Sequence, residues 1–265
     1  MTEPTGGPQR RAQGESARPP RPAAPEQGRA LPRGAGSGAP PTEGPRFRAA
    51  LFDMDGLLID SERAISEAWL AGARELGFEL EMADFVRVIG TAAQQSTALL
   101  IEIMGSEEAM RATAEKARAL LPQSGGHPVF PLKTGALPLL EALHAAGIPC
   151  GVASSSSVAE IRHRLGHVDV LRYFRCVTGG DEVARGKPDP AIYLLAAERL
   201  GVAPSECIAF EDSENGARAA QAAGVRVVIV PDLKHPPEDV AARAHGVIGS
   251  LADAIGHVPH WFPRL

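Results

Sequence analysis

The pattern of hydrophobic positions divides the chain into short apolar runs and longer stretches of helical periodicity. The apolar runs occupy residues 48–53, 148–155, 207–212 and 225–231, and their small and β-branched residues are typical of buried strands. Helical spacing of apolar residues, ending each time in glycine, occurs at 137–147, 190–201 and 214–224. Strands that alternate with helices predict an α/β fold, with a doubly wound parallel sheet covered on both faces.

The stretch between the first two strands has a different pattern. Between residues 63 and 130 the spacing predicts helices only, in the segments SERAISEAWLAGARELGF, MADFVRVIG, QQSTALLIEIMG and SEEAMRATAEKARALL. We therefore expect a core domain formed by residues 47–62 and 131–255, with a small helical cap domain at 63–130 inserted into it. The linkers are expected near Leu57–Asp60 and His127–Lys133, with a cleft between the two domains.

Residues 1–46 differ from the rest of the chain in composition. They are rich in proline, glycine and arginine and hold ten of the 23 prolines. Such a segment cannot bury enough apolar surface to offset its ordering entropy, so we expect a disordered tail. We expect it to be a passive extension or the result of a misassigned start codon, with contact to RNA or an anionic surface as the alternative.

Charge and composition exclude several classes of function. The formal net charge of −5 does not favour nucleic acid as a partner. No apolar run approaches the ~20 residues of a membrane span, and the first residues lack the apolar stretch of a secretory signal. The three cysteines, at positions 150, 176 and 207, form no paired motif and predict buried, reduced thiols in a cytoplasmic protein.

Polar residues that suggest chemistry follow the predicted strands. They are Asp53 and Asp55 after the first strand, Ser154 and Ser155 at the end of the second, Lys187 within GKPDP, and Glu211 and Asp212 at the end of the third. In an open parallel sheet, ligands bind outside the carboxyl ends of the strands. Several carboxylates there suit Mg²⁺, whereas hydroxyls, backbone N–H groups and an ammonium favour an anion such as phosphate. Together they indicate phosphoryl transfer.

The ordered set of DMDG, the serine after the second strand, the GKP lysine and the ED pair resembles the four motifs of the haloacid dehalogenase (HAD) superfamily. The resemblance covers residues 47 to about 250, and the helical insert resembles the C1 cap of the β-phosphoglucomutase and sugar-phosphatase branch. It implies that Asp53 is the nucleophile and forms an aspartyl phosphate. It also implies that Asp55 is the general acid and base, and that Lys187 offsets the negative charge that develops.

The remaining motif residues have implied binding roles. Ser154, with the backbone of Ser155, would hold a phosphate oxygen. Asp212 would bind Mg²⁺ together with Asp53 and the backbone carbonyl of Asp55, with Glu211 either a ligand or a residue behind the metal. The two following serines, Ser156 and Ser157, are expected to cap the next helix instead.

Three reactions of this superfamily differ in the residues that they require. A 2-haloacid dehalogenase typically lacks the second aspartate, which is present here as Asp55. β-Phosphoglucomutase uses a cap histidine and a cap arginine, whose positions fall at Ile65 and near Ala92–Ala93. We therefore expect a Mg²⁺-dependent phosphomonoester hydrolase, with a phosphosugar mutase or a non-catalytic HAD-fold binding protein as alternatives.

The cap is expected to set the substrate. Glu62, Gly90 and Thr91 are candidate contacts, because polar groups of this kind suit a small polyhydroxyl metabolite such as a sugar phosphate or a phosphoglycolate-like compound. We expect a monomer, since the cap must open and close over the site.

Overall fold

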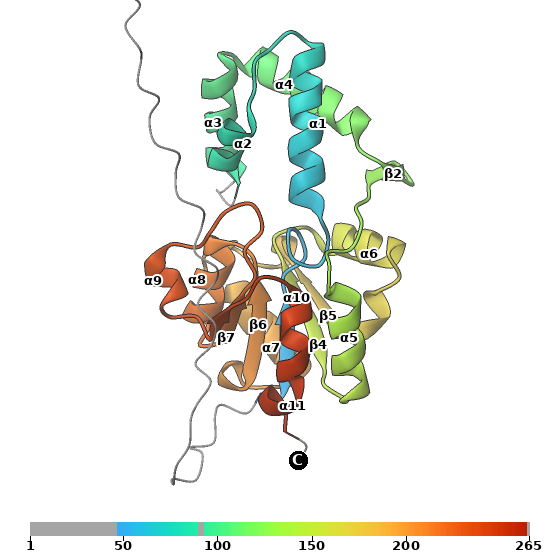
Figure 1. Cartoon of the computed structure of the whole chain (residues 1–265), viewed down its shortest axis with the longest axis vertical. Helices are drawn as coiled ribbons and strands as arrows, with labels where there is room; N and C mark the ends of the chain where they lie inside the picture. The colour runs from blue at the N-terminus through green and yellow to red at the C-terminus, as the bar shows by residue number, and fades with distance from the viewer. Residues whose placement is uncertain (1–46, 90–92, 264–265) are drawn as a thin grey trace, which may run out of the picture. The chain divides into compact units, whose positions relative to one another are not determined.

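The core of the protein is a six-stranded parallel sheet. The computed structural model describes residues 47–89 and 93–263. Within them the strand order is β5-β4-β1-β6-β7-β8, and every neighbouring pair is parallel (Figure 1). The strands are β1 (Ala49–Phe52), β4 (Cys150–Ser154), β5 (Phe174–Gly179), β6 (Cys207–Glu211), β7 (Arg226–Ile229) and β8 (Gly246–Val247). The expected α/β fold with a doubly wound sheet is confirmed.

Helices cover both faces of the sheet because alternate residues of the central strand point to opposite sides. In β1, Ala50 and Phe52 belong to one hydrophobic cluster, whereas Ala49 and Leu51 belong to another. The first cluster includes residues of α5 (Ala136–Ala145), α6 (Val158–His167), α10 (Leu251–Ala254) and α11 (Val258–Trp261). The second includes residues of α7 (Ala191–Leu200), α8 (Glu214–Ala222) and α9 (Glu238–Ala241). Short 3-10 turns lie at Leu171–Tyr173, Gly180–Glu182, Pro204–Glu206 and Ile255–His257.

Two strands of the six-stranded sheet were not predicted, and both lie at its edges. The edge strand β5 is buried only over its last three residues, so its sequence FRCVTG has no continuous apolar run. The other, β8, has only two residues. The four predicted strands are those in the middle of the sheet, where burial on both faces requires the apolar runs that the sequence displays.

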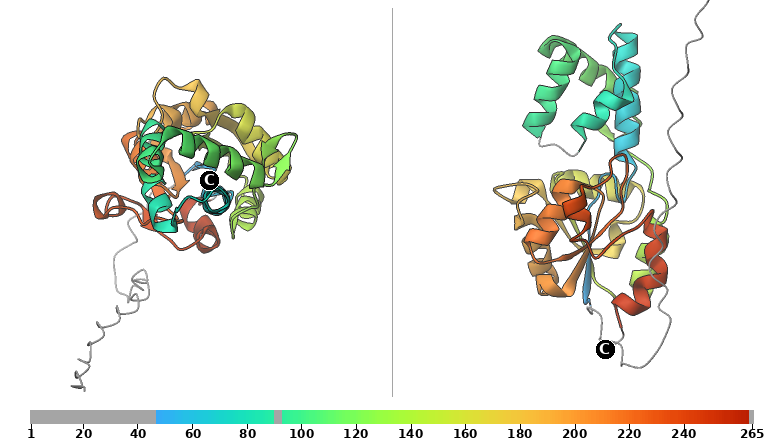
Figure 2. Two further views of the ribbon diagram at one scale, coloured as in Figure 1. Left: turned by 90° about the horizontal axis from the view of Figure 1, so that it is seen from above. Right: turned by 60° about the vertical axis from the view of Figure 1, so that its left-hand side comes forward.

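Four helices follow the first strand and have a hydrophobic cluster of their own. They are α1 (Ser61–Glu75), α2 (Met82–Val88), α3 (Ala93–Met104) and α4 (Glu107–Leu120), and Figure 2 shows them beyond one end of the sheet. Their cluster includes Phe85, Val88, Leu100 and Met104. The exact division into core and cap domains stays a prediction, and residues 1–46 lie outside the described residues.

The expectation that residues 63–130 contain only helices is wrong at its end. Gln123–Ser124 (β2) and His127–Pro128 (β3) form a short antiparallel hairpin around Gly125 and Gly126, a pair that suits a two-residue turn. The predicted linker at His127–Lys133 thus begins inside a strand.

The two connections between the helical insert and the sheet are bonded to each other. The backbone N–H of Asp60 donates to the carbonyl of Pro131, and that of Lys133 donates to the carbonyl of Leu58, both at 2.9 Å. Ile59 and Leu132 form an antiparallel bridge between these bonds. Any movement of the insert relative to the sheet must therefore bend both of these hydrogen-bonded connections, residues 58–60 and 131–133, which together form the hinge.

No helix among the described residues is long and apolar enough to cross a membrane. Cys150 and Cys207 are buried free thiols, as expected, while Cys176 is free but only partly buried.

The ends of α5 provide a matched test of backbone packing. Gly135, its N-cap, has a φ of 86°, and a Cβ there would lie 2.2 Å from the backbone nitrogen of Ala252. Gly147, beyond the other end, has a φ of 72° but no atom within 4 Å of such a Cβ. We expect Gly147→Ala to cost about 1–2 kcal/mol for the left-handed backbone alone. Gly135→Ala should cost at least about 1–3 kcal/mol more, because of the collision. Urea denaturation of both variants measures the difference, and equal losses would contradict this packing.

Candidate active site

The carboxyl ends of two central strands, β1 and β6, bring together three of the predicted acidic residues. Asp53 directly follows β1, Glu211 is the last residue of β6, and Asp212 comes next. Because β1 pairs with β6, carboxylate oxygens of all three residues lie within 4.8 Å of one another. Each side chain is buried or nearly so. Three acids this close, away from water, require a compensating positive charge.

Lys187 supplies one such charge. Its Nζ donates to Asp53 Oδ1 and to Glu211 Oε1, both at 2.6 Å, and its side chain is only 6% exposed. Burial acts to lower the pKa of the ammonium, but the adjacent carboxylates of Asp53 and Glu211 outweigh it and raise that pKa above its ordinary value. Lys187 therefore remains a cation throughout the physiological range.

Glu211 is held by a ring of donors. Tyr193 donates its hydroxyl to Oε1 at 2.6 Å, in addition to the bond from Lys187. The hydroxyl of Ser213 donates to Oε2 at 3.2 Å. Since both oxygens are already occupied and the residue is fully buried, Glu211 is better placed to hold Lys187 than to face a metal directly. Sequence reasoning missed Tyr193, which no motif distinguishes from the apolar residues around it in α7.

The other two acids remain available to a cation. Burial raises the pKa of Asp53 to about 7, against the opposing effect of Lys187. Burial, and then the charges of Asp53 and Glu211, raise the pKa of Asp212 well above its ordinary value. Asp212 Oδ1 is buried and accepts no hydrogen bond from any described residue. An orphaned carboxylate oxygen beside a second carboxylate fits a hard divalent cation such as Mg²⁺.

Gly56 allows the DMDG turn to pass close to this group. Its φ is 82°, and a Cβ there would lie 2.3 Å from Asp212 Oδ2 and 3.3 Å from the carboxyl carbon of Glu62. A side chain at this position would therefore occupy the space beside the Asp212 carboxylate.

The serines after β4 divide into distinct environments. Ser154 is buried, and its hydroxyl accepts from the backbone N–H of Ser156 at 3.2 Å, whereas Ser155 is exposed. Ser157 is the N-cap of α6 and accepts from Glu160 N, as expected. The prediction that Ser156 is also a cap is wrong, because its hydroxyl points to the site and donates to Asp55 Oδ2 at 2.9 Å.

Asp55 is held separately from the buried acids. Its Oδ1 accepts from Nη1 of Arg164, a residue of α6, at 2.8 Å, and its Oδ2 accepts from Ser156. The carboxylate is 30% exposed and thus reaches solvent, unlike that of Asp53. Sequence reasoning missed Arg164, because a single arginine on an amphipathic helix carries no motif.

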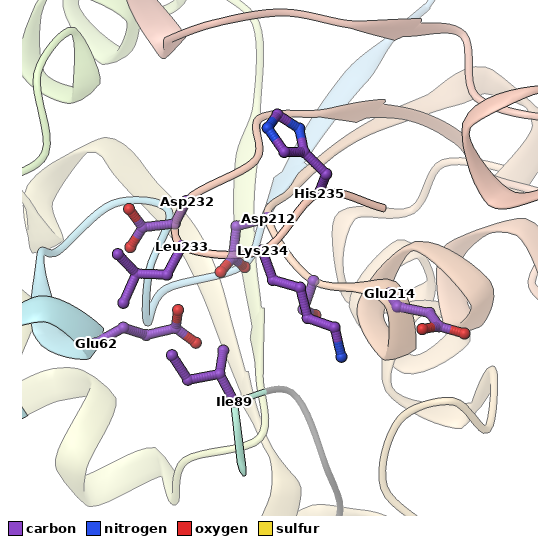
Figure 3. Close-up of a pocket in the computed structure, with 9 residues that line it drawn as sticks. Glu62, Ile89, Asp212, Glu214, Asp232, Leu233, Lys234 and His235 are labelled. Atoms are coloured by element: carbon purple, nitrogen blue, oxygen red, sulfur yellow. The ribbon is translucent and has the colours of Figure 1, made fainter. Parts of the chain in front are cut away.

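Glu62 lines a narrow pocket beside Asp212, together with Asp232 from the loop after β7 and Ile89 from the helical insert (Figure 3). Burial and the charge of Asp232 raise the pKa of Glu62 to about 7. Asp232 is only 5% exposed, and Lys133 Nζ lies 2.5 Å from its Oδ1, while its Oδ2 has no partner among the described residues. The other predicted contacts, Gly90 and Thr91, lie outside the described residues.

Comparison with known proteins agrees with this arrangement. The sequence matches the haloacid dehalogenase-like hydrolase family over residues 47–224. It is 31% identical to the phosphorylated carbohydrates phosphatase of Thermotoga maritima over 212 residues, which cover 78% of this chain and 88% of that protein. It is 37% identical to hexitol phosphatase A of Escherichia coli over 187 residues, covering 70% and 83%.

A solved structure gives the same result at the level of the fold. The HAD family hydrolase of Deinococcus radiodurans R1, crystallised with phosphate and sodium, superposes with a TM-score of 0.66 at 25% identity, covering 84% of this chain and all of that one. The family match extends over most of the residues that form the sheet, and it includes the ends of β1 and β6, where Asp53, Glu211 and Asp212 lie. The chain belongs to the haloacid dehalogenase-like hydrolase family.

Proposed function

We propose that this protein is a Mg²⁺-dependent phosphatase that hydrolyses a small phosphorylated carbohydrate through an aspartyl phosphate. That it is a phosphatase of the HAD family follows from its relatives, and the metal, the intermediate and the substrate are the proposal. One observation carries it: Asp53 is held by a buried lysine, next to the unsatisfied oxygen of Asp212 at the strand ends.

In this proposal Asp53 attacks the phosphorus atom, and the bond from phosphorus to the leaving oxygen breaks. Asp55 gives its proton to that oxygen and later takes a proton from the water that hydrolyses the aspartyl phosphate. Lys187 offsets the charge of the nucleophile and the phosphoryl group, and it is already in place, so no reorganisation is needed. The strand β4 ends at Ser154, whose hydroxyl and the adjacent backbone of Ser155 would hold a phosphate oxygen.

Asp53, Asp212 and the backbone carbonyl of Asp55 would hold the Mg²⁺, with Glu211 behind them holding Lys187. The ion would neutralise phosphate charge and help to orient the phosphoryl group. The raised pKa values of Asp53 and Asp212 support this assignment, because burial first and the neighbouring carboxylates second disfavour their charged forms, and a bound cation would oppose both effects.

The substrate class is inferred from two sources. The relatives from T. maritima and E. coli are named for phosphorylated carbohydrates and hexitols. Beside the proposed metal site, the pocket offers the carboxylates of Glu62 and Asp232, which accept hydrogen bonds as the hydroxyls of such a compound require.

Hydrolysis is favoured over the mutase alternative. The position of the mutase histidine is Ile65, whose side chain packs against both the cluster of the sheet and the cluster of the insert. An apolar side chain there cannot exchange a proton. A non-catalytic role is disfavoured because residues of all four motifs are present and Lys187 is ion-paired with both Asp53 and Glu211.

The first prediction concerns the nucleophile. Asp53→Asn should reduce Mg²⁺-dependent phosphate release from an aryl phosphate by at least about 10³-fold, since an amide does not form the covalent intermediate. The matched control is Asp169→Asn, at an exposed position outside the site, which should keep full activity. Phosphate release is measured with and without Mg²⁺, and activity that survives in Asp53→Asn would exclude the mechanism.

The second prediction concerns pH. Metal-free folded protein holds a proton on Asp53 up to a pKa of about 7, whereas the unfolded chain releases it near 4, so this carboxyl lowers folding stability as pH rises from 4 to 7. Mg²⁺ must displace that proton to bind. If Asp53 is the one carboxyl that loses a proton, the affinity of the protein for Mg²⁺ should rise about tenfold from pH 6 to pH 8. Calorimetric titration with Mg²⁺ checks this, with Asp212→Asn as the variant that should lose binding. Equal affinity at both pH values would contradict it.

The third prediction concerns the substrate. On a panel of phosphorylated metabolites, kcat/KM should be highest for sugar and polyol phosphates. Glu62→Gln should lower kcat/KM for these compounds by about tenfold, the cost of one or two hydrogen bonds to a charged acceptor, while leaving an aryl phosphate nearly unchanged. Turnover restricted to nucleotides would refute the assignment of the substrate class.

A further inference from the structure

The carboxylate of Asp55 is oriented by two donors on the side of α6, neither of which belongs to a motif. Arg164 Nη1 donates to Oδ1 at 2.8 Å and Ser156 Oγ donates to Oδ2 at 2.9 Å. Since a carboxylate with a donor on each oxygen has lost most of its rotational freedom, these two contacts determine where the group points.

The guanidinium of Arg164 is itself fixed on several sides. The side chain is 14% exposed, its Nη2 lies 3.5 Å from Glu160 Oε1, and its Cζ lies 5.4 Å from the centre of the Phe130 ring. The carboxylate of Glu160 in turn accepts hydrogen bonds from the backbone N–H and the hydroxyl of Ser157, the N-cap of α6. An arginine held by an acid, an aromatic face and its helix is a rigid support.

Phe130 connects this support to the hinge. It directly precedes Pro131, whose carbonyl accepts the backbone N–H of Asp60 across the two connections. The ring is buried in the hydrophobic cluster of the sheet. Arg164 therefore lies between Asp55 and the connection through which the helical insert joins the core.

We propose that Arg164 is a positioning residue that fixes the proton-transferring oxygen of Asp55. Arginine has only donors, so Oδ1 of Asp55 accepts from Arg164, whereas the hydroxyl of Ser156 on Oδ2 can act as donor or acceptor. Oδ2 is therefore the oxygen that is free to exchange hydrogen-bond partners with the leaving oxygen. This inference rests on the proposed phosphatase mechanism, in which Asp55 is the general acid.

The inference has a consequence that depends on the leaving group. The kcat/KM value reports the steps up to departure of the alcohol or phenol. An alkoxide is a poor leaving group and needs the proton, whereas a nitrophenolate leaves without one. A positioning residue for the acid should therefore matter for alkyl phosphates and not for activated aryl phosphates.

The experiment compares kcat/KM for a sugar or polyol phosphate and for p-nitrophenyl phosphate, in full-length protein with Mg²⁺. We expect Arg164→Met to reduce the alkyl value by about 10²-fold, within the usual range for general acid catalysis, and to change the aryl value less than about threefold. Arg164→Lys keeps the charge but not the planar fork, and should give an intermediate loss. The matched control is Arg162→Met, an exposed position on the same helix, which should match the wild type with both substrates.

The outcomes separate this inference from the function on which it rests. If Asp53→Asn is inactive and Arg164→Met loses both activities equally, or loses neither, the positioning role is overturned while the phosphatase stands. If Asp53→Asn remains active, the phosphatase mechanism itself fails. Should Arg164→Met not fold, as thermal unfolding would reveal, Ser156→Ala removes the other donor to Asp55. A loss confined to the alkyl substrate would then support the proposal, and equal effects on both would overturn it.

Discussion

The site depends on one buried interaction, the contact of Lys187 with Asp53 and Glu211. Removing three charges from water is costly, and their mutual attraction offsets that cost only when the geometry is good and the remaining lone pairs are satisfied. Here Tyr193 and Ser213 complete the hydrogen bonding of Glu211. The cluster still holds more carboxylates than cations, since Oδ1 of Asp212 has no hydrogen-bond partner among the described residues. A fold that keeps this imbalance is prepared for a cation that the chain does not itself supply.

The parallel sheet brings the residues of this cluster together. Adjacent strands β1 and β6 end at the same edge, so residues more than 150 positions apart in sequence place carboxylate oxygens within 4.8 Å of one another. The backbone of each strand is locked by ladder bonds and by helices on both faces, which keeps the carboxylates from moving apart as their charges repel. Rigid burial would thus serve the proposed nucleophile, Asp53, for which any displacement from the phosphorus atom would be costly.

The four inner strands and their acidic residues could be predicted because burial and chemistry produce two different patterns in the sequence. Strands β1, β4, β6 and β7 are apolar on both faces and appeared as runs, and the acids stood directly after them. The edge strand β5 escaped prediction because half of it faces solvent. Tyr193 and Arg164 escaped for a different reason: each is an ordinary helical residue whose role arises only where α7 or α6 meets the site. Roles that depend on tertiary contact leave no local pattern.

The two aspartates of DMDG, two residues apart, meet opposite requirements, and the fold separates them accordingly. Asp53 is enclosed with Lys187, where its position cannot change. Asp55 is partly exposed, and its partners are the hydroxyl of Ser156, which follows β4, and the guanidinium of Arg164 in α6. A nucleophile works best when it is fixed, whereas a group that must both give and take a proton needs a partner that can reverse its hydrogen bond. The hydroxyl of Ser156 is such a partner, and Arg164, the other donor to Asp55, lies over the ring of Phe130 next to the paired connections.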